Sequence, residues 1–130
     1  MWTAWAFHHQ RYAQINLAAP YYAAAFAIEA VLLFVVGVAA GRLRFGAESG
    51  GSLVPCLLAI VVLAYPLLAP LTGRSWTAAE VFGTAPDPTA LGSVAALSSV
   101  QGRVRWLLLI VPLLWCAIAA ATWWTMREVA

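Results

Sequence analysis

The chain contains no lysine, and only 9% of its residues are charged. Soluble domains carry about 25% charged residues, so a soluble globular protein is disfavoured. The seven arginines are scattered along the chain and the formal net charge is only +2, so we expect no nucleic-acid partner. The first residues lack the basic stretch, apolar core and small-residue cleavage site of a secretory signal peptide.

Cysteine is also scarce, and the two cysteines, Cys56 and Cys116, each lie inside an apolar run. In such a setting a cysteine usually acts as a small buried apolar side chain. A disulfide scaffold or a cysteine-based metal site is therefore disfavoured. We expect no metal and no other cofactor.

Long apolar runs are abundant, at residues 20–41, 53–71 and 104–126. A hydrocarbon core about 30 Å thick requires about 20 helical residues that rise about 1.5 Å each, so each run is long enough to cross it. Hydrophobic residues make up 64% of the chain. The sequence therefore predicts an all-α integral membrane protein with three clear transmembrane helices, in contact with the lipid bilayer.

The remaining segments complete a single membrane domain over residues 1–130. Aromatic and polar residues alternate in residues 1–19, which is typical of an amphipathic helix at the membrane interface. Pro66 should kink the second transmembrane helix because it removes a backbone hydrogen bond. Residues 72–88 then form the one long loop.

Residues 88–101 predict a short fourth helix, with Asp87 as its N-cap and Pro88 at its first position. Small side chains dominate this segment, and the candidate packing residues are Gly92, Ser93, Ala96 and Ser99. Small residues allow close approach of helix backbones, so we expect the segment to lie between other helices of a four-helix bundle. Its length leaves open whether it crosses fully or enters as a half-helix.

The arginines predict an orientation if all four helices cross. Four of them would then share one side, namely Arg42, Arg44, Arg103 and Arg105, and three would lie on the other, namely Arg11, Arg74 and Arg127. The positive-inside rule favours the first group as cytoplasmic and both termini as outside.

Glu29 lies near the middle of the first apolar run. An ionised, unpaired carboxylate at that depth costs roughly 2.5 kcal/mol or more, so Glu29 must be protonated, paired or turned to a polar cavity. One interpretation is a proton or cation relay or a binding-site carboxylate. The other is a neutral side chain that hydrogen-bonds to a neighbouring helix, for instance to Ser93, Ser98 or Ser99.

Two further groups of polar residues are candidates for function. His8 and His9 are adjacent, so on a helix they point about 100° apart and do not form a two-ligand metal site. One of them could be an axial haem ligand, or both could be interfacial histidines. Arg74, Glu80 and Asp87 could form a polar cluster in the long loop, or simply a solvated, charged loop.

Four stretches carry a family resemblance: FHHQRYAQINLAAPYYAAAF (residues 7–26), AYPLLAPLTGR (64–74), VFGTAPDPTALG (81–92) and IVPLLWCAIAAA (110–121). In this order they resemble the blocks of DUF6064, a bacterial multi-pass family of unknown function. The resemblance covers nearly the whole chain, and the Pro-x-Pro-Thr loop is its most specific element. It implies a location in the bacterial plasma (inner) membrane.

The chain also departs from the pattern of that family. Asp87 stands where the family usually has Cys, and Arg74 where it usually has His, which argues against a metal or redox role for the loop. The chain begins at a later block than the family pattern, so we expect it to lack N-terminal helices that members usually carry.

These features favour a protein without catalytic activity, most simply a small accessory or structural subunit of a larger membrane complex. The small-residue helix supports this interpretation, because its surface needs a partner or a second copy of the chain to pack against. A small permease or channel-like oligomer that uses Glu29 is the first alternative. The second is a haem- or metal-binding electron-transfer subunit that uses His8 or His9.

Overall fold

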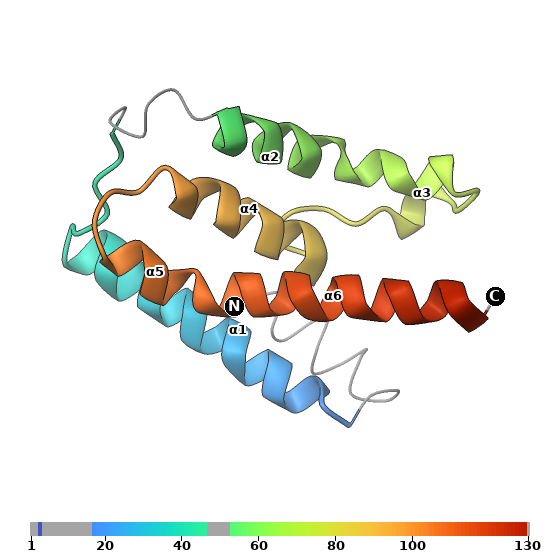
Figure 1. Ribbon diagram of the computed structural model, residues 1–130, viewed down its shortest axis with the longest axis horizontal. Coiled ribbons are helices and arrows are strands. Elements are labelled where there is room, and N and C mark those ends of the chain that lie inside the picture. Colours follow the sequence, from blue (N-terminus) through green and yellow to red (C-terminus); the bar gives the residue numbers. More distant parts are fainter. Residues whose placement is uncertain (1–2, 4–16, 47–52, 130) are drawn as a thin grey trace.

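The computed structural model describes residue 3, residues 17–46 and residues 53–129, and over these residues the chain is all-helical (Figure 1). The one β-type pairing in this part is an isolated antiparallel bridge between Phe45 and Val100. In chain order the elements are α1 (Ala19–Leu33) with its π-helical continuation (Phe34–Ala39), α2 (Leu53–Ala64), a 3₁₀ turn (Tyr65–Leu67), α3 (Leu68–Leu71), a second 3₁₀ turn (Trp76–Ala78), α4 (Pro86–Ser98), α5 (Val104–Leu108) and α6 (Ile110–Val129). The interfacial helix expected over residues 1–19 falls almost wholly outside the described residues.

Three helical segments are long and apolar enough to cross a membrane, Ala19–Ala39, Leu53–Leu71 and Ile110–Glu128. They overlap the three predicted runs, and the second has the predicted bounds. A long apolar segment satisfies its backbone polar groups internally only as a helix, so hydropathy alone locates such segments well. The predicted all-helical architecture with three membrane-length helices is confirmed.

Prolines mark one break inside the second segment and another just before the third. At Tyr65–Leu67 the second segment changes to a 3₁₀ turn, because Pro66 has no N–H to donate to a carbonyl in the preceding turn. The change of helix type thus falls at Pro66, while the predicted kink stays a prediction. α5 ends at Leu108, the residue whose carbonyl would pair with the missing N–H of Pro112 in a continuous helix, and α6 starts at Ile110.

α4 packs against α2 on one side and α6 on the other, and α1, α2, α4 and α6 run in alternating directions (Figure 1). Its 13 residues rise about 20 Å, which is less than a hydrocarbon core about 30 Å thick. The C-terminal end of α4 lies close to the start of α5, so its N-terminal end lies part-way along α6 (Figure 1).

The start of α4 differs from the sequence-based expectation. The helix begins at Pro86, its N-cap is the extended residue Ala85, and Asp87 lies in its first turn. The expected start at residue 88 with Asp87 as the N-cap is therefore wrong. Either proline suits a first helical turn, and the structure uses the earlier one because the side chain of Thr89 organises the residues before it.

The connection that follows the π-helical continuation of α1 and the start of α5 lie at the same end of the molecule (Figure 1). The first contains Arg42 and Arg44, and the second contains Arg103 and Arg105. There the Gln101 N–H donates to the Arg44 carbonyl at 2.9 Å. A core of Leu97, Val100, Leu108 and Leu109 lies beneath these connections. The turn after α3 and the C-terminus of α6 lie at the opposite end (Figure 1).

Candidate functional site

The loop before α4 holds Asp87 in a fixed position. Gly83 has a φ of 84°, which a glycine adopts at little cost. The Gly83 N–H donates to Thr89 Oγ1 at 2.9 Å, and the Thr89 hydroxyl donates to the Ala85 carbonyl. The Gly83 carbonyl accepts a hydrogen bond from Thr3 Oγ1 at 2.9 Å. This closed set of bonds fixes the backbone where α4 begins.

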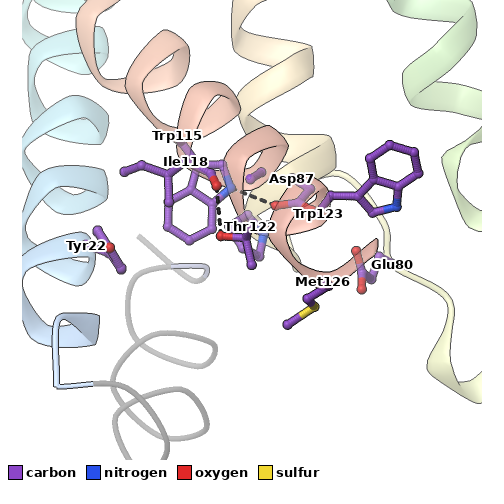
Figure 2. Close-up of a pocket in the computed structure, with 10 residues that line it drawn as sticks. Tyr22, Glu80, Asp87, Trp115, Ile118, Thr122, Trp123 and Met126 are labelled. Carbon is purple, nitrogen blue, oxygen red and sulfur yellow. Dashed lines mark hydrogen bonds between the residues drawn. The ribbon is translucent and has the colours of Figure 1, made fainter. Parts of the chain in front are cut away.

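The Asp87 carboxylate accepts hydrogen bonds from two of the membrane-length segments. The Trp115 indole Nε1–H of α6 donates to Asp87 Oδ1 at 2.7 Å (Figure 2), and the Tyr65 hydroxyl donates to Asp87 Oδ2 at 3.2 Å. Tyr65 lies six residues before Leu71, the end of its apolar segment. At about 1.5 Å per residue, Tyr65 and the carboxylate that it contacts lie about 9 Å along the helix axis from that end of the segment.

Two features of the structure interact favourably with the Asp87 carboxylate. It lies in the first turn of α4, where the helix dipole stabilises an anion by about 0.3–1 kcal/mol. Hydrogen bonds to an ionised acceptor are also stronger than bonds to a neutral one. Among the described residues no cation lies within salt-bridge distance of Asp87, and the one ion pair there joins Arg74 and Glu80.

Trp115 lies where α1, α4 and α6 meet, and only 8% of its surface is exposed. Two α1 rings make edge-to-face contacts with it, Tyr22 with centroids 5.1 Å apart and Phe26 with centroids 5.4 Å apart. On the α4 side it packs against Ala90. These contacts hold the indole in the orientation that directs its N–H at Asp87.

A cavity of about 310 Å³ lies beside the Trp115–Asp87 pair and opens to the outside (Figure 2). Its walls come from α1, the loop before α4, α4 and α6, and the lining residues are Tyr22, Glu80, Pro86, Asp87, Trp115, Ile118, Ala119, Thr122, Trp123 and Met126. A smaller cavity of about 120 Å³ reaches the same pair from the side of Tyr65, Leu91 and Cys116. Asp87 therefore borders open space on two sides.

The loop residues Arg74 and Glu80 form an ion pair with Nη1 and Oε1 3.7 Å apart. Burial raises the pKa of Glu80 above its usual value, the negative charge of Asp87 raises it further, and Arg74 opposes both effects. Within the predicted cluster the structure thus pairs Arg74 with Glu80, while Asp87 turns to Trp115 and Tyr65. Asp87 and Glu80 remain close enough to interact electrostatically.

Glu29 is buried on α1 with 4% of its surface exposed. Neither carboxylate oxygen has a hydrogen-bond partner within the described ranges. The suggested bonds to Ser93, Ser98 or Ser99 are absent, and the Ser98 hydroxyl donates instead to the Ala95 carbonyl of its own helix at 2.8 Å. Glu29 is therefore a buried acid without the partner that one interpretation assigned to it.

Three of the four candidate packing residues line an apolar cavity between α2 and α4. Gly92, Ala96 and Ser99 lie along this cavity of about 530 Å³, which we call the α2–α4 groove. A Cβ atom on Gly92 would lie 2.4 Å from the Phe82 ring, so glycine makes room for that ring. Ser93 is half-buried and does not line the groove.

Residues 1–128 match the sequence profile of a family described as a family of unknown function, DUF6064. The chain belongs to the DUF6064 family. No curated protein and no solved structure is similar enough to the chain to count as a match.

Three of the four stretches through which the chain resembles the DUF6064 family meet at Asp87. One contributes Tyr65, the Pro-x-Pro-Thr loop contributes Asp87 and Thr89, and the last contributes Trp115. Sequence reasoning did not identify Tyr65 and Trp115 as the partners of Asp87. The available signal was a hydrogen-bonding aromatic side chain inside each of two apolar segments, in the same stretches that resemble the family.

The suggested haem- or metal-ligand role of His8 and His9 stays a prediction. His8 and His9 lie outside the described residues. In the part of the chain that is described, no three His, Cys, Asp or Glu side chains are close enough together to hold a metal ion. Cys56 and Cys116 are both free thiols there.

Proposed function

We propose that the chain is a non-enzymatic integral protein of the bacterial plasma membrane and a subunit of a small permease, in which Asp87 binds a cation in transit. One observation carries this proposal: the Asp87 carboxylate lies between two membrane-length segments, oriented by Trp115 and Tyr65, and borders an open cavity. Inserting an ionisable acidic side chain at the centre of the bilayer costs about 2.5–3.5 kcal/mol of free energy. Acidic residues within the membrane therefore typically mark ion or substrate pathways.

The short α4 supports the same function. In the proposed four-helix bundle of α1, α2–α3, α4 and α5–α6, the α4 helix begins inside the membrane, after the non-helical residues 79–85. Non-helical backbone at that depth is tolerated where it is buried in protein or lines a cavity. Helices interrupted within the membrane are typical of the binding sites of transporters.

Glu29 provides a second acid for the proposed path. It lies on α1 one turn beyond Phe26, whose ring contacts Trp115, the indole donor to Asp87. A buried carboxyl group without a hydrogen-bond partner favours the neutral form, because desolvation penalises the charge. We therefore propose that Glu29 carries a proton while Asp87 carries the cation.

Charge-displacement currents from proteoliposomes on a solid support test this function. Concentration jumps of monovalent cations, inorganic and organic in turn, should give for at least one of them a saturable current that Asp87→Asn abolishes. Glu128→Gln is the matched control, because Glu128 Oε1 accepts an indole hydrogen bond from Trp124 at 2.9 Å but is exposed. Glu29→Gln should change the dependence of the current on a pH gradient. An Asp87→Asn protein that is folded and gives the wild-type current would refute the proposal.

A specific observation also favours an accessory or structural subunit of a larger membrane complex. The α2–α4 groove is wide, apolar and bordered by small side chains, so it could accommodate a helix of another membrane protein or of a second copy. Ala96→Leu would fill the groove, whereas Ala121→Leu on the exposed face of α6 would not. Native gels after extraction in mild detergent should show a smaller assembly for Ala96→Leu alone. Equal assembly sizes for both variants would contradict a partner in the groove.

The proposed orientation places the end that carries Arg42, Arg44, Arg103 and Arg105 in the cytoplasm. In that orientation the 310 Å³ cavity opens toward the outer side, because Trp123 and Met126 line it near the C-terminal end of α6. A cysteine introduced at Ser75 should then react with a membrane-impermeant thiol reagent in intact cells, and a cysteine at Gln101 should not.

A further inference from the structure

The 310 Å³ cavity has the size of a small-molecule site. Binding pockets for small molecules range from about 300 to 1,000 Å³, so this cavity is at the lower end and suits a ligand of few heavy atoms. The cavity is partly open, and Asp87 and Trp115 are among the residues that line it (Figure 2). A ligand that fills it would touch both the carboxylate and the ring of Trp115.

The walls offer one strong charge and several aromatic rings. Asp87 is the acid in contact with Trp115, and the rings of Tyr22, Trp115 and Trp123 border the same space. Each Asp87 oxygen already accepts one hydrogen bond. Because a carboxylate has about four acceptor positions, it retains capacity to receive a ligand N–H or to face a quaternary nitrogen.

The charged side chains around the cavity favour a ligand that carries a single positive charge. The Glu80 charge is opposed by Arg74 at 3.7 Å, whereas in the described part of the chain Asp87 has no cationic side chain as a partner. About one negative charge therefore remains for a ligand. The wall does not offer the dense set of carboxylate and carbonyl oxygens with which proteins hold Ca²⁺, which takes six to eight oxygen ligands.

Aromatic walls also select the type of monovalent cation. An ammonium group within about 6 Å of an aromatic face is attracted by the ring quadrupole, and sites for quaternary ammonium ligands commonly use such rings. An exposed cation–π contact of this kind is already present in the chain, where the Arg127 Cζ lies 4.6 Å from the centre of the Trp123 ring. A strongly hydrated inorganic ion gains less from aromatic walls, because the free energy of losing its hydration shell is larger than the attraction to the rings.

We infer that the cavity beside Asp87 binds a monovalent organic ammonium ion, with the carboxylate opposite the nitrogen and the Tyr22 and Trp115 rings around its alkyl groups. This inference rests on the proposed permease function and names the substrate class of the same site. No bond is made or broken, so the ion enters and leaves unchanged.

Calorimetric titration of the full chain in lipid nanodiscs tests the inference with choline as the probe. Its neutral isostere 3,3-dimethyl-1-butanol has the same shape without the charge. Choline should bind with saturation, and the isostere at least about tenfold more weakly. This comparison uses the wild-type protein, so it is informative even if every site variant fails to fold. Equal affinities, or no saturable binding of choline, would overturn the inference.

Site variants then locate the bound ion. Asp87→Asn should weaken choline binding by at least about tenfold, and the exposed-pair control Glu128→Gln should leave it unchanged. Tyr22→Leu removes an aromatic ring from the cavity wall and should weaken choline binding several-fold. A folded Asp87→Asn protein that binds choline as wild type does would overturn the assignment.

The failures of the two proposals are distinguishable. Asp87-dependent currents with Na⁺, K⁺ or NH₄⁺ but no saturable choline binding would leave the permease function and remove the organic ammonium ligand. Asp87-dependent choline binding without any current would keep the ligand site and remove the permease function.

Discussion

The hydrogen bond between Trp115 and Asp87 should stabilise the fold by an amount that a single substitution can measure. Trp115→Phe keeps an aromatic ring against Tyr22 and Phe26 but removes the N–H that donates at 2.7 Å. A hydrogen bond to a charged group contributes about 1.5–3 kcal/mol. We therefore expect Trp115→Phe to lower the free energy of unfolding by at least about 1.5 kcal/mol, measured by circular dichroism during titration of mixed micelles with dodecyl sulfate.

A double-mutant cycle separates that bond from the loss of ring volume. In an Asp87→Asn background the acceptor is neutral, and neutral hydrogen bonds contribute about 0.5–1.5 kcal/mol, so the cost of Trp115→Phe should fall by about 1 kcal/mol. Trp124→Phe is the matched control, because its indole donates to Glu128 at 2.9 Å at an exposed position. That substitution should cost less than about 1 kcal/mol. Equal costs for Trp115→Phe and Trp124→Phe, or an unchanged cost in the Asp87→Asn background, would refute the reasoning.

Three further predictions concern the loop before α4. Thr89→Val removes the hydroxyl that accepts from Gly83 and should cost about 1–3 kcal/mol of unfolding free energy, whereas Thr89→Ser should retain most of it. Gly83→Ala forces a side chain into a φ of 84° and should cost about 1–2 kcal/mol by the same assay. Burial and the charge of Asp87 raise the folded-state pKa of Glu80 above 4.5, and Arg74 opposes both effects. Protonated Glu80 therefore contributes its full stabilisation below pH 4.5, and this stabilisation is lost as the pH rises through the raised pKa. The midpoint of thermal unfolding should therefore fall less between pH 4.5 and 8 in Glu80→Gln than in wild type, and an identical pH profile would contradict this cause.

The membrane-length segments could be predicted because their signal is local. The segment Leu53–Leu71 has the bounds that its hydropathy gives, and Pro66 interrupts it for a reason visible in the sequence. The start of α4 could not be fixed in this way, since both Pro86 and Pro88 suit a first turn. The bond from Gly83 to Thr89, which links residues six positions apart, decides between them.

The candidate site depended on contacts between distant residues. The sequence indicated Asp87 as a helix cap or a loop charge, because no local rule connects it to Tyr65 or Trp115, 22 and 28 residues away. For Glu29 the position within the apolar run predicted a carboxyl group that is protonated, paired or turned to a polar cavity, but the serines suggested as its partners make no bond to it. Which face of a helix meets which neighbour is set by the packing of the whole bundle.

The most direct test of the account follows from the composition, because Asp87 is the only aspartate in the chain. Protein made with aspartate carrying ¹³C in the side-chain carboxyl group therefore reports on this single residue by infrared difference spectroscopy in nanodiscs. The account predicts an ionised carboxylate band that shifts on addition of choline and not on addition of its neutral isostere. A labelled band that choline leaves unchanged while the protein is folded would contradict Asp87 as the cation-binding group.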